Sequence, residues 1–501
     1  MTQCKLEIGD GGFSMDSTDV IRSNLHTRLD RLPWGRFHWL VVGALGASWA
    51  IDGLEVTLSG AVGAVLQNPA SLGLSPDLIG AAASAYLLGA VLGALVCGYL
   101  TDRHGRKVMF FATLAIYLGG TLLSATAWDF WSLAAFRFVT GIGIGGEYAA
   151  INSAIDELIP ARVRGQVNLF INGSYWLGAA VGAVATLVLL DTSFFAVDVG
   201  WRLGFAIGAV LGAVVLFARR FIPESPRWLI VHGQQAQAEA VMAQIEARNG
   251  RAANTDAKAA DAKGDVANAD DDYIIIRRRQ STSLAEVFDT LLRRYPRRTV
   301  LGLTLIGAQA FLYNAIFFTY ALVLVRFYEV PEARTGIYLL PFAIGNFLGP
   351  LLLGRWFDTL GRRLCISVTY AISGVLLLVS AALFVRGALD AQGQMLLWAT
   401  IFFFASAAAS AAYLTVSELF PLEIRALAIA VFFAVGTALG GVAAPWLFGS
   451  LIGTGSREAV SYGYLLGAVL MLIAAAVEAW LGVDSERKSL ERIAPPLSTG
   501  D

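Results

Sequence analysis

Twelve long apolar segments are the feature of this sequence that most restricts its fold. A helix that crosses the hydrocarbon core of a bilayer needs about 20 mostly apolar residues, and such a helix satisfies all its backbone hydrogen bonds internally. The segments cover residues 38–66, 78–100, 108–127, 131–157, 166–190, 202–222, 299–326, 335–356, 364–386, 394–419, 426–452 and 460–482. The sequence therefore predicts an all-α, multi-pass membrane protein with twelve transmembrane helices.

The composition agrees with a membrane protein and argues against other classes. Hydrophobic residues make up 56% of the 501 residues and charged residues only 15%, whereas soluble domains carry about 25% charged residues. The net charge of -1 gives no sign of a nucleic-acid partner, and three cysteines are too few for a disulfide framework. The first apolar segment is too long for a signal peptide and no small-residue cleavage site follows it, so we expect it to be retained.

The twelve segments fall into two groups of six on either side of a polar stretch. We expect a tail at 1–37, a first bundle at 38–222, a linker at 223–298, a second bundle at 299–482 and a tail at 483–501. Connectors on the linker's side carry nine basic residues and those on the opposite side five. By the positive-inside rule, the linker and both tails are cytoplasmic. The compact tails carry no organelle address, so we expect a bacterial inner membrane.

The linker is not uniform in composition. Residues 249–272 are rich in Ala, Asp, Asn and Gly and are predicted to be disordered. A short helix is predicted at 236–247. The apolar residues of 284–292 repeat at helical spacing, which suits a helix on the inner membrane face or a helix packed on the bundle ends.

Two short patterns occur once in each half at almost the same separation. Residues 102–107 (DRHGRK) recur as 358–363 (DTLGRR), and residues 157–164 (ELIPARVR) recur as 418–425 (ELFPLEIR). Internal duplication of this kind is typical of transporters, whose substrate binds near the midplane between the two halves. The sequence thus predicts two pseudo-symmetric six-helix bundles.

At these residues the chain resembles the major facilitator superfamily. Residues 98–107 (GYLTDRHGRK) look like the signature between its second and third helices. Residues 137–146, 223–229 (PESPRWL) and 418–425 are similar to its sugar-porter-like and metabolite:proton symporter branches, and the similarity extends over 38–482. The resemblance implies the fold of that superfamily and the transport of a small molecule by alternating access.

Acids and bases stand in matched positions where the helices of both halves meet the cytoplasm. Paired, they would close the inward mouth, and separated, they would open it. Exposed pairs contribute roughly 0–1 kcal/mol each, which suits a gate with two states of similar free energy. The alternative is that these charges only set the topology. The predicted gate residues are Asp102, Arg103, Arg106, Glu157, Arg164, Glu224, Arg227, Asp358, Arg362, Glu418 and Arg425.

Several ionisable residues lie inside predicted spans, where a carboxylate costs several kcal/mol unless it is neutralised, paired or hydrated. Asp52 and Glu55 share one face of the first span. The resemblance implies that Glu55 takes the place of the membrane aspartate of proton-coupled sugar porters and that Arg137 is its partner. We expect Glu55, Asp52, Glu147 and Arg137 to couple transport to protons, with Glu55 taking up a proton when its pair with Arg137 separates. Static ion pairs, and a structural hydrogen bond at Glu147, are the alternatives.

The resemblance also implies a set of substrate-binding residues. Gln309, Asn314 and Asn346 fall on amides of the sugar porters, whereas Asn172 and Tyr413 replace a glutamine and a tryptophan. These replacements remove partners that a hexose would use. Aromatic residues in the spans favour a more apolar lining, and the residues considered for it are Trp176, Phe317, Phe318, Tyr320 and Tyr413. A sugar and an organic or aromatic acid both remain open as substrates.

No pattern of a cofactor, a metal site or a catalytic centre occurs. The glycines of 141–146 lie inside an apolar span and are interpreted as helix-packing residues. No phosphate-binding loop and no nucleophile–base or metal-ligand spacing is present. The sequence therefore predicts a monomeric secondary active transporter that imports a small molecule with protons. A uniporter or exporter of the same fold, or a non-transporting membrane sensor, is the alternative.

Overall fold

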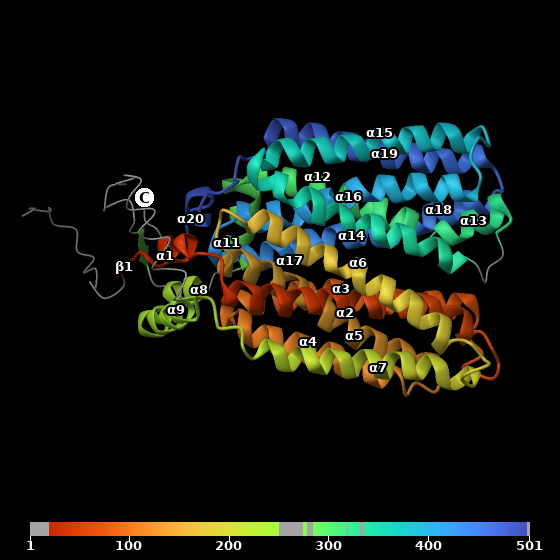
Figure 1. Cartoon of the computed structure of the whole chain (residues 1–501), viewed down its shortest axis with the longest axis horizontal. Coiled ribbons are helices and arrows are strands. Elements are labelled where there is room, and N and C mark those ends of the chain that lie inside the picture. Colours follow the sequence, from red (N-terminus) through yellow and green to blue (C-terminus); the bar gives the residue numbers. More distant parts are fainter. Residues whose placement is uncertain (1–19, 250–273, 278–283, 318, 331–334, 498–501) are drawn as a thin grey trace, which may run out of the picture.

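The computed structural model describes residues 20–249, 274–277, 284–317, 319–330 and 335–497 of the chain. Its long helices form two bundles that lie side by side (Figure 1). The N-terminal bundle contains α2 (Arg36–Leu66), α3 (Pro76–His104), α4 (Arg106–Ser124), α5 (Phe130–Leu158), α6 (Arg164–Leu189) and α7 (Val197–Arg219). The C-terminal bundle contains α12 (Pro296–Phe317), α13 (Tyr320–Tyr328), α14 (Thr335–Thr359), α15 (Arg362–Val385), α16 (Ala391–Leu419), α17 (Arg425–Gly436), α18 (Ala444–Gly453) and α19 (Arg457–Leu481). The predicted all-helical membrane fold is confirmed.

Within the described chain, eleven helices are long and apolar enough to cross a membrane. α5 is not among them, although its 29 residues exceed the length that a span requires. Arg137 and Glu147 lie inside this helix, and Asp156 and Glu157 lie near its end. α5 packs between α3 and α4 within the N-terminal bundle. α5 therefore brings the number of predicted spans found in the described residues to twelve, and its interior face is polar.

Two predicted spans are interrupted helices. In the span predicted at 299–326, α12 ends at Phe317 and α13 begins at Tyr320. In the span predicted at 426–452, the π-helical segment η4 (Thr437–Ala443) separates α17 from α18. A Cβ at Gly440 would come within 2.5 Å of the backbone of Ala310, so this glycine allows η4 to approach α12 closely. Such π segments occur often at functional sites, and η4 contributes Thr437 to the central cavity described below.

Glycines also set the tight packing of α3 on α5. A Cβ at Gly141 or Gly145 would overlap the backbone oxygen of Tyr86 or Ala90. The glycine run of 141–146 is therefore a helix-packing surface, as predicted. Between the bundles, α3 packs on α17 and α6 packs on α14. These two helix pairs are counterparts of each other in the two repeats.

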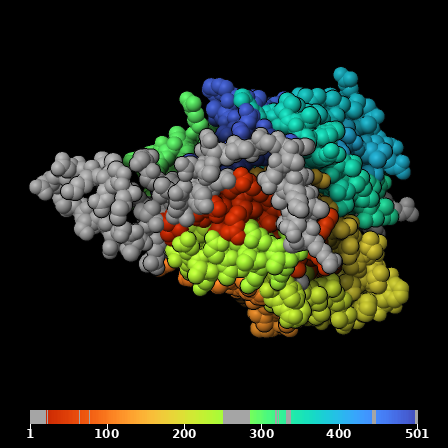
Figure 2. Space-filling view, turned by 60° about the vertical axis from the view of Figure 1, so that its left-hand side comes forward, coloured from red at the N-terminus to blue at the C-terminus, as the bar shows by residue number. Residues whose placement is uncertain are grey.

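The segments outside the bundles gather at one end of the molecule, which we call the linker end (Figure 1). They are β1 (Val20–Ser23), α1 (Leu25–Arg31), α8 (Pro226–Val231), α9 (Gln235–Asn249), β2 (Ile274–Arg277), α11 (Leu284–Asp289), η1 (Thr290–Arg294) and α20 (Leu490–Ile493). β1 pairs antiparallel with β2, so the N-terminal segment and the linker are joined by a small sheet away from the helices of the membrane. Figure 2 shows α8 and α9, in yellow-green, against the surface of the N-terminal half.

The linker agrees with its sequence pattern where the structure describes it. The helix predicted at 236–247 is α9, and the helical spacing of 284–292 corresponds to α11 and η1. Val287 and Leu291 are buried on the bundle ends, whereas Phe288 and Leu292 are exposed. The segment predicted to be disordered, 249–272, lies outside the described residues except for Asn249, which ends α9.

Candidate substrate and proton sites

A cavity of ≈ 250 Å³ lies between the two bundles, which we call the central cavity. The N-terminal bundle contributes residues of α2, α3, α5 and α6, and the C-terminal bundle contributes residues of α12, α16, α17 and η4. No Asp, Glu, Lys or Arg lines it in the part of the chain that the structure describes. Its aromatic lining consists of Trp49, Tyr86, Tyr148, Tyr175, Trp176, Tyr313, Tyr413 and Phe433. The central cavity is thus an uncharged, aromatic site between the repeats.

Most of the residues predicted to bind substrate lie on this cavity. The lining includes Asn172, Trp176, Gln309, Asn314 and Tyr413. Asn346 does not line it. This residue is fully buried, accepts a hydrogen bond of 2.7 Å from the hydroxyl of Tyr313 and donates to the carbonyl of Phe342. Asn346 therefore orients a lining tyrosine from behind.

The amides of the cavity are held by local hydrogen bonds. Gln309 Nε2 donates to the hydroxyl of Tyr413 at 3.4 Å, which links α12 to α16. Asn314 Nδ2 donates to the Ala310 carbonyl at 2.7 Å. Asn172 Nδ2 contacts both the carbonyl and the side-chain oxygen of Asn168, at 3.0 Å and 2.9 Å. These contacts fix the amide planes, so each presents a defined polar edge to a ligand.

Aromatic rings of the two bundles meet across the cavity. Tyr148 of α5 lies 4.4 Å from Phe433 and 5.9 Å from Tyr413, measured between ring centroids. Trp176 of α6 lies 5.8 Å from Tyr313 of α12. Ring pairs at these separations contribute about 0.5–1.5 kcal/mol beyond the area they bury. They therefore help to hold the two bundles together around the central cavity.

Most of this aromatic lining was missed in the sequence. Residues at helical spacing do share one face, as in Gln309 and Tyr313, or Ser406, Ser410 and Tyr413. That spacing is the signal that could have found them, once one member of each face was assigned to the cavity. Of the aromatic residues that were considered, Tyr320 lies outside the lining, and the side chains of residues 317 and 318 lie outside the described part.

Glu55 and Arg137 form a buried ion pair, as expected. Glu55 Oε1 accepts from Arg137 Nη1, and the hydroxyl of Ser59 donates to the same oxygen at 3.3 Å. The Arg137 guanidinium lies 4.5 Å from the centroid of the Tyr86 ring and 5.4 Å from that of Phe205. The ion pair is therefore surrounded by Ser59, Tyr86 and Phe205.

A second cavity of ≈ 150 Å³ adjoins the pair, and Arg137, Ser59 and Tyr86 are among its lining residues. It shares Val56, Tyr86 and Leu87 with the central cavity. The ring of Tyr86 thus lies between the guanidinium and the space available to a substrate. Glu55 itself lines neither cavity.

Glu147 forms a different buried pair, with Arg219 at the end of α7. Arg219 also donates to the hydroxyl of Ser48 and, at 3.1 Å, to the carbonyl of Phe110. Arg219 was missed because it stands beside Arg220, where a basic residue suggests a helix end. Glu147 is thus a charged partner in the core of the N-terminal bundle, and it does not line the central cavity.

Asp52 lies between the two ion pairs without one of its own. It is 1% exposed, and neither carboxylate oxygen has a hydrogen-bond partner among the described residues. The charged groups facing it are Glu147, Arg219 and Glu55. Three carboxylates therefore face two guanidiniums in this bundle, and a buried carboxylate without a partner is neutralised rather than kept charged.

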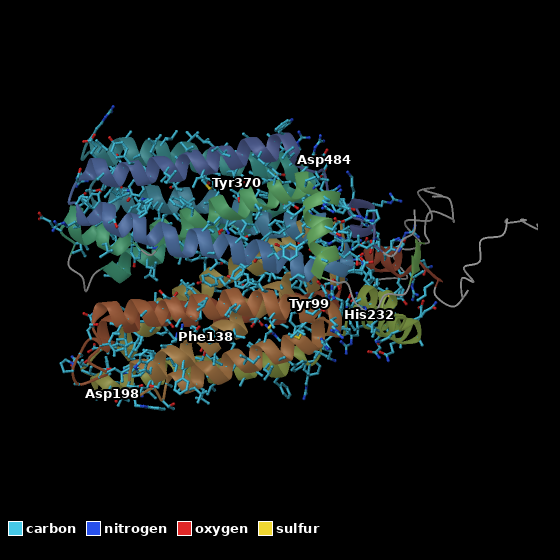
Figure 3. The ribbon with its side chains drawn as sticks, turned by 180° about the vertical axis from the view of Figure 1, so that it is seen from behind. Tyr99, Phe138, Asp198, His232, Tyr370 and Asp484 are labelled. Atoms are coloured by element: carbon cyan, nitrogen blue, oxygen red, sulfur yellow. The ribbon has the colours of Figure 1, made fainter. Side chains whose placement is uncertain are left out.

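At the linker end, buried ion pairs join the two bundles. We call this set the gate network, and it consists of Asp102, Arg106, Glu157, Arg164, Asp358, Arg362, Glu418 and Arg425. In the N-terminal bundle, Arg106 contacts Glu157 at 2.8 Å and Asp102 at 3.2 Å. Figure 3 shows that the nitrogen-rich side chains gather at this end, near His232, and Asp198 marks the opposite end.

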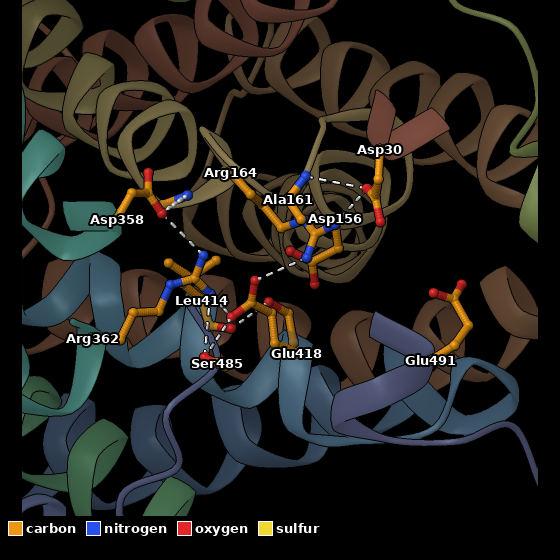
Figure 4. A network of polar contacts seen from close by, with 12 residues as sticks. Asp30, Asp156, Ala161, Arg164, Asp358, Arg362, Leu414, Glu418, Ser485 and Glu491 are labelled. Atoms are coloured by element: carbon orange, nitrogen blue, oxygen red, sulfur yellow. Dashed lines mark hydrogen bonds and ion pairs between the residues drawn. The ribbon is translucent and has the colours of Figure 1, made fainter. Parts of the chain in front are cut away.

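The C-terminal bundle repeats the same contacts (Figure 4). Arg362 pairs with Glu418 and contacts Asp358 at 3.2 Å. The hydroxyl of Ser485, from the C-terminal segment, donates to Glu418 at 3.1 Å. The charge pattern found twice in the sequence is therefore one three-residue arrangement formed twice.

Each bundle also caps a helix of the other. Asp102 accepts the amides of residues 426 and 427 at 3.3 and 3.0 Å, at the start of α17. Asp358 accepts the amides of residues 165 and 166 at 3.1 and 2.7 Å, at the start of α6. A carboxylate at a helix N-terminus satisfies orphan amides and opposes the helix dipole. These caps cross the interface in both directions.

Two ion pairs also join the two bundles. Arg164 contacts Glu418 at 3.2 Å, and Arg425 lies 3.7 Å from Glu157. All four side chains are at most 1% exposed. The expectation of exposed, weak pairs is wrong for this arrangement, because each bundle covers the charged helix ends of the other. Removing one member of a buried pair costs about 3–5 kcal/mol, since its partner is left charged and buried.

Segments outside the bundles extend the network on one side. Asp30 of α1 lies 3.5 Å from Arg164 and 3.3 Å from Arg227, and Arg227 lies 3.0 Å from Glu491 of α20. The N-terminal segment, the linker and the C-terminal segment therefore meet beside the gate network. Burial by itself would raise the pKa of Glu491, but the charge of Arg227 holds that pKa below its ordinary value.

The remaining gate predictions concern Glu224 and Arg103. Glu224 accepts the amides of Arg106 and Lys107 at 3.0 and 3.1 Å, so it caps α4 next to the gate network. Burial raises the pKa of Glu224, against the effect of these hydrogen bonds. Arg103 is exposed and makes no ion pair within the described residues. The structure thus brings together every predicted gate residue except Arg103.

Comparison with known proteins adds to this geometry. Residues 59–495 match the model of the family described as "Sugar (and other) transporter". The niacin transporter NiaP of Acinetobacter baylyi is 26% identical over 475 residues, which cover 94% of this chain and 99% of NiaP. The 4-hydroxybenzoate transporter PcaK of the same organism is 31% identical over 222 residues, which cover 43% of this chain and 46% of PcaK.

Solved structures share the fold. The proton:xylose symporter XylE bound to 6-bromo-6-deoxy-D-glucose superposes with a TM-score of 0.74 at 18% identity, over 91% of this chain and 98% of XylE. A partially occluded inward-open conformation of XylE from E. coli gives a TM-score of 0.60 at 18% identity, over 87% and 97%. Both structures are of one membrane transporter, and this chain shares their fold.

Proposed function

The chain belongs to the sugar (and other) transporter family, and from that premise we propose that it imports a small aromatic metabolite together with protons. The observation that carries the proposal is the central cavity, whose lining is uncharged and aromatic and which adjoins the Glu55–Arg137 pair through Tyr86. An aromatic ring can stack on these side chains, and the amides supply hydrogen bonds for its polar substituents. A hexose would use more polar partners than the lining offers.

The relatives support this substrate class. NiaP and PcaK are named for niacin and 4-hydroxybenzoate, each of which carries a carboxylate on one six-membered aromatic ring. The volume of ≈ 250 Å³ lies just below the usual range of about 300–1,000 Å³ for ligand sites, as suits a single-ring compound. Because no cationic side chain lines the described cavity, the carboxylate of such a substrate would bind to the amides, or to Arg137 after a rearrangement around Tyr86.

We place the linker end in the cytoplasm because the basic connectors lie at that end. We place the protein in a bacterial inner membrane because NiaP and PcaK are transporters of a bacterium. The gate network then closes the cytoplasmic mouth in this structure, and the pair of Glu55 with Arg137 is formed. In the proposed cycle a proton from outside neutralises Glu55 and frees Arg137, while substrate occupies the central cavity. The bundles then rock, the gate network separates, and both cargoes leave inward.

The membrane potential makes this coupling useful. Import of one carboxylate anion with two protons moves one net positive charge inward. One charge that crosses 100 mV releases roughly 2.3 kcal/mol, which supports about a fiftyfold accumulation of substrate. Asp52 is a second proton carrier in the proposal, because it is neutral when buried without a partner and faces Glu147 and Glu55. The two carboxyl groups are one helical turn apart on α2, so a proton can pass between them through a small rearrangement.

The test is uptake by the purified full chain in proteoliposomes. Nicotinate, 4-hydroxybenzoate, xylose and acetate are compared with an inward proton gradient, without one, and with the gradient collapsed by a protonophore. We expect gradient-dependent accumulation of an aromatic acid and little uptake of xylose or acetate. Uptake that ignores the gradient would instead establish a uniporter, and preference for xylose would overturn the substrate class.

Substitutions locate the coupling group. Glu55→Gln is expected to abolish accumulation while retaining exchange of labelled for unlabelled substrate, because a neutral side chain resembles the protonated state. Asp52→Asn is expected to reduce accumulation as well. The matched control is Glu458→Gln, an exposed carboxylate at the opposite end of the C-terminal bundle, which should behave like wild type. If Glu55→Gln still accumulates substrate, Glu55 is not the coupling residue.

A further inference from the structure

A cavity of ≈ 450 Å³ lies at the linker end, outside the gate network, among α4, α7, α8 and α9. Its cationic lining comes from three different segments: Lys107 from α4, Arg220 just after α7, and Arg248 from α9. Glu224 is the one carboxylate of the described lining, and backbone amides of α4 already bind both of its oxygens. We call this space the basic cavity, because three cations face a single carboxylate whose acceptors are in use.

The cations of the basic cavity are available to an anion. None of the three has a carboxylate partner within the described residues. The Arg220 guanidinium stacks on the rings of Phe217 and Phe221, at 3.6 and 4.6 Å from their centroids. Arg248 donates to the Phe221 carbonyl at 3.2 Å. These contacts position the two guanidiniums at the cavity without neutralising them.

Other polar groups of the lining are donors to an oxyanion. Gln234, Gln237 and Gln244 reach the cavity from the linker and carry amide NH₂ groups. A phosphate group accepts hydrogen bonds from guanidinium, ammonium and amide donors at once. The polar side of the basic cavity is therefore suited to a phosphate rather than to a neutral or cationic ligand.

The other side of the basic cavity is apolar and continues onto the lipid-facing surface. Val108 of α4 is 56% exposed and Phe221 is 42% exposed, and both line the cavity. The apolar face of α7 runs on from there with Val214 and Phe217, which are 63% and 57% exposed. α4 and α7 are membrane helices, so this wall lies where the acyl chains of a lipid begin. A soluble phosphate compound has no acyl chains and would leave these apolar side chains uncovered.

We propose that the basic cavity binds the phosphate headgroup of an anionic phospholipid from the adjoining leaflet. Basic pockets beside membrane helices on the cytoplasmic side favour such headgroups, and each nearby Lys or Arg contributes about a fivefold gain in affinity. The acyl chains lie over Val108 and Phe221, and the phosphate lies among Lys107, Arg220 and Arg248.

This site adjoins the gate. Glu224 lines the basic cavity and caps the amides of Arg106 and Lys107, and Arg106 belongs to the gate network. A headgroup that bridges Arg248 and Lys107 holds α9 against α4 and keeps Glu224 in its capping position. Bound lipid therefore stabilises the closed linker end. This consequence rests on the proposed transport cycle, whereas lipid binding itself does not.

The experiment measures the thermal stability of the purified full chain in a neutral detergent. Phosphatidylglycerol, phosphatidylcholine, glycerol 3-phosphate and inorganic phosphate are titrated separately. We expect phosphatidylglycerol to raise Tm in a saturable way at concentrations where the other three do not. The triple variant Lys107→Gln, Arg220→Gln, Arg248→Gln is expected to need at least tenfold more phosphatidylglycerol for the same shift, in line with about fivefold for each cation.

The matched control removes three cations elsewhere at the linker end: Arg293→Gln, Arg294→Gln and Arg355→Gln, all of them exposed. It should respond to phosphatidylglycerol like wild type. Equal loss in the control, or an unchanged response of the cavity variant, would overturn the proposal. Equal stabilisation by glycerol 3-phosphate would assign the site to a soluble phosphate compound instead. If the triple variant does not fold, Arg220→Gln alone, at an exposed position, gives the same comparison. Loss of lipid binding with intact uptake separates this inference from the transport proposal.

Discussion

The N-terminal and C-terminal bundles repeat each other at the linker end but differ at mid-membrane depth. At the linker end each contributes two arginines, a glutamate and a helix-capping aspartate to the gate network. Deeper in the membrane, the N-terminal bundle buries Asp52, Glu55, Arg137, Glu147 and Arg219. The corresponding spans of the C-terminal bundle contain no Asp, Glu, Lys or Arg in residues 299–325, 335–354, 364–385, 391–417, 426–456 and 459–477.

The C-terminal bundle fills its interior with neutral hydrogen bonds. Tyr370 donates to the Leu305 carbonyl at 2.8 Å, and Gln394 donates to Ser380 at 3.1 Å. In the proposed cycle both bundles take part in closing the linker end, which accounts for the same gate charges in both. Buried charges are costly, and in the proposed cycle only groups of the N-terminal bundle take up and release a proton. We infer that the N-terminal bundle handles the proton and the C-terminal bundle mainly orients the substrate.

The largest effect is expected from breaking a buried ion pair in the N-terminal bundle. Arg219→Met leaves Glu147 buried without its partner, so that it must either stay charged or take up a proton, and both cost free energy. The free energy of unfolding should fall by about 3–5 kcal/mol. Tyr370→Phe, in the C-terminal bundle, removes a neutral hydrogen bond and should cost about 1 kcal/mol. Denaturant unfolding in detergent measures both. The double variant Glu147→Gln, Arg219→Met should recover most of the loss; equal costs in the two bundles would contradict the contrast between them.

The two helix caps test whether both bundles contribute equally to closing the linker end. Asp102→Asn and Asp358→Asn each weaken charge-assisted hydrogen bonds across the interface, which contribute about 1.5–3 kcal/mol. Each should increase the open population at the linker end about tenfold. The readout is the labelling rate of Asn172→Cys by a membrane-impermeant thiol reagent added on that side, with the three native cysteines replaced by alanine. If only one substitution accelerates labelling, the gate is not symmetric.

Tyr86 lines the central cavity and contacts the Arg137 guanidinium, whereas Tyr413 lines the central cavity beside Gln309 and Tyr148. Tyr86→Leu removes a cation–π contact of about 0.5–2 kcal/mol with Arg137. It should raise KM about three- to thirtyfold and alter the dependence of KM on external pH. Tyr413→Leu should raise KM without altering that dependence. Identical pH profiles in both variants would show that the bundles do not divide the two tasks.

The smallest effect is expected where an outer segment touches the gate network on one side. The pKa of Glu491 is held below its ordinary value of 4.5, so its pair with Arg227 stabilises the fold above that pH and loses its effect as the pH falls through the lowered pKa. Glu491→Gln should therefore lower the free energy of unfolding at pH 7, but by less than the loss of a fully buried pair, because Arg227 keeps Asp30 as a partner and Glu491 is 10% exposed. Variant and wild type should unfold alike in strong acid; a difference that persists there would have another cause.

Much of the fold could be predicted because a bilayer imposes simple rules. The length of the apolar segments, the linker position and the duplicated motifs follow from the one-dimensional pattern. The interruptions near Thr319 and in η4 could not be predicted, because an apolar sequence is compatible with a continuous helix. Close packing of η4 on α12 at Gly440 depends on a neighbour far away in sequence.

The candidate sites divide in the same way. Glu55 and Arg137 stand out because charges inside spans are costly. Arg219 did not stand out, since its position near a helix end hides that it reaches Glu147. The same holds for Asn346, whose amide could have faced the cavity but lies behind Tyr313.

The sequence by itself determined the class of protein, the two repeats and the residues that must be neutralised or paired, because hydropathy and charge act locally along the chain. Only the tertiary structure decided which partner each charge takes, which rings face the central cavity, and that the gate charges are buried. These depend on how helices distant in sequence rotate and pack against one another, and many rotations bury the same apolar area.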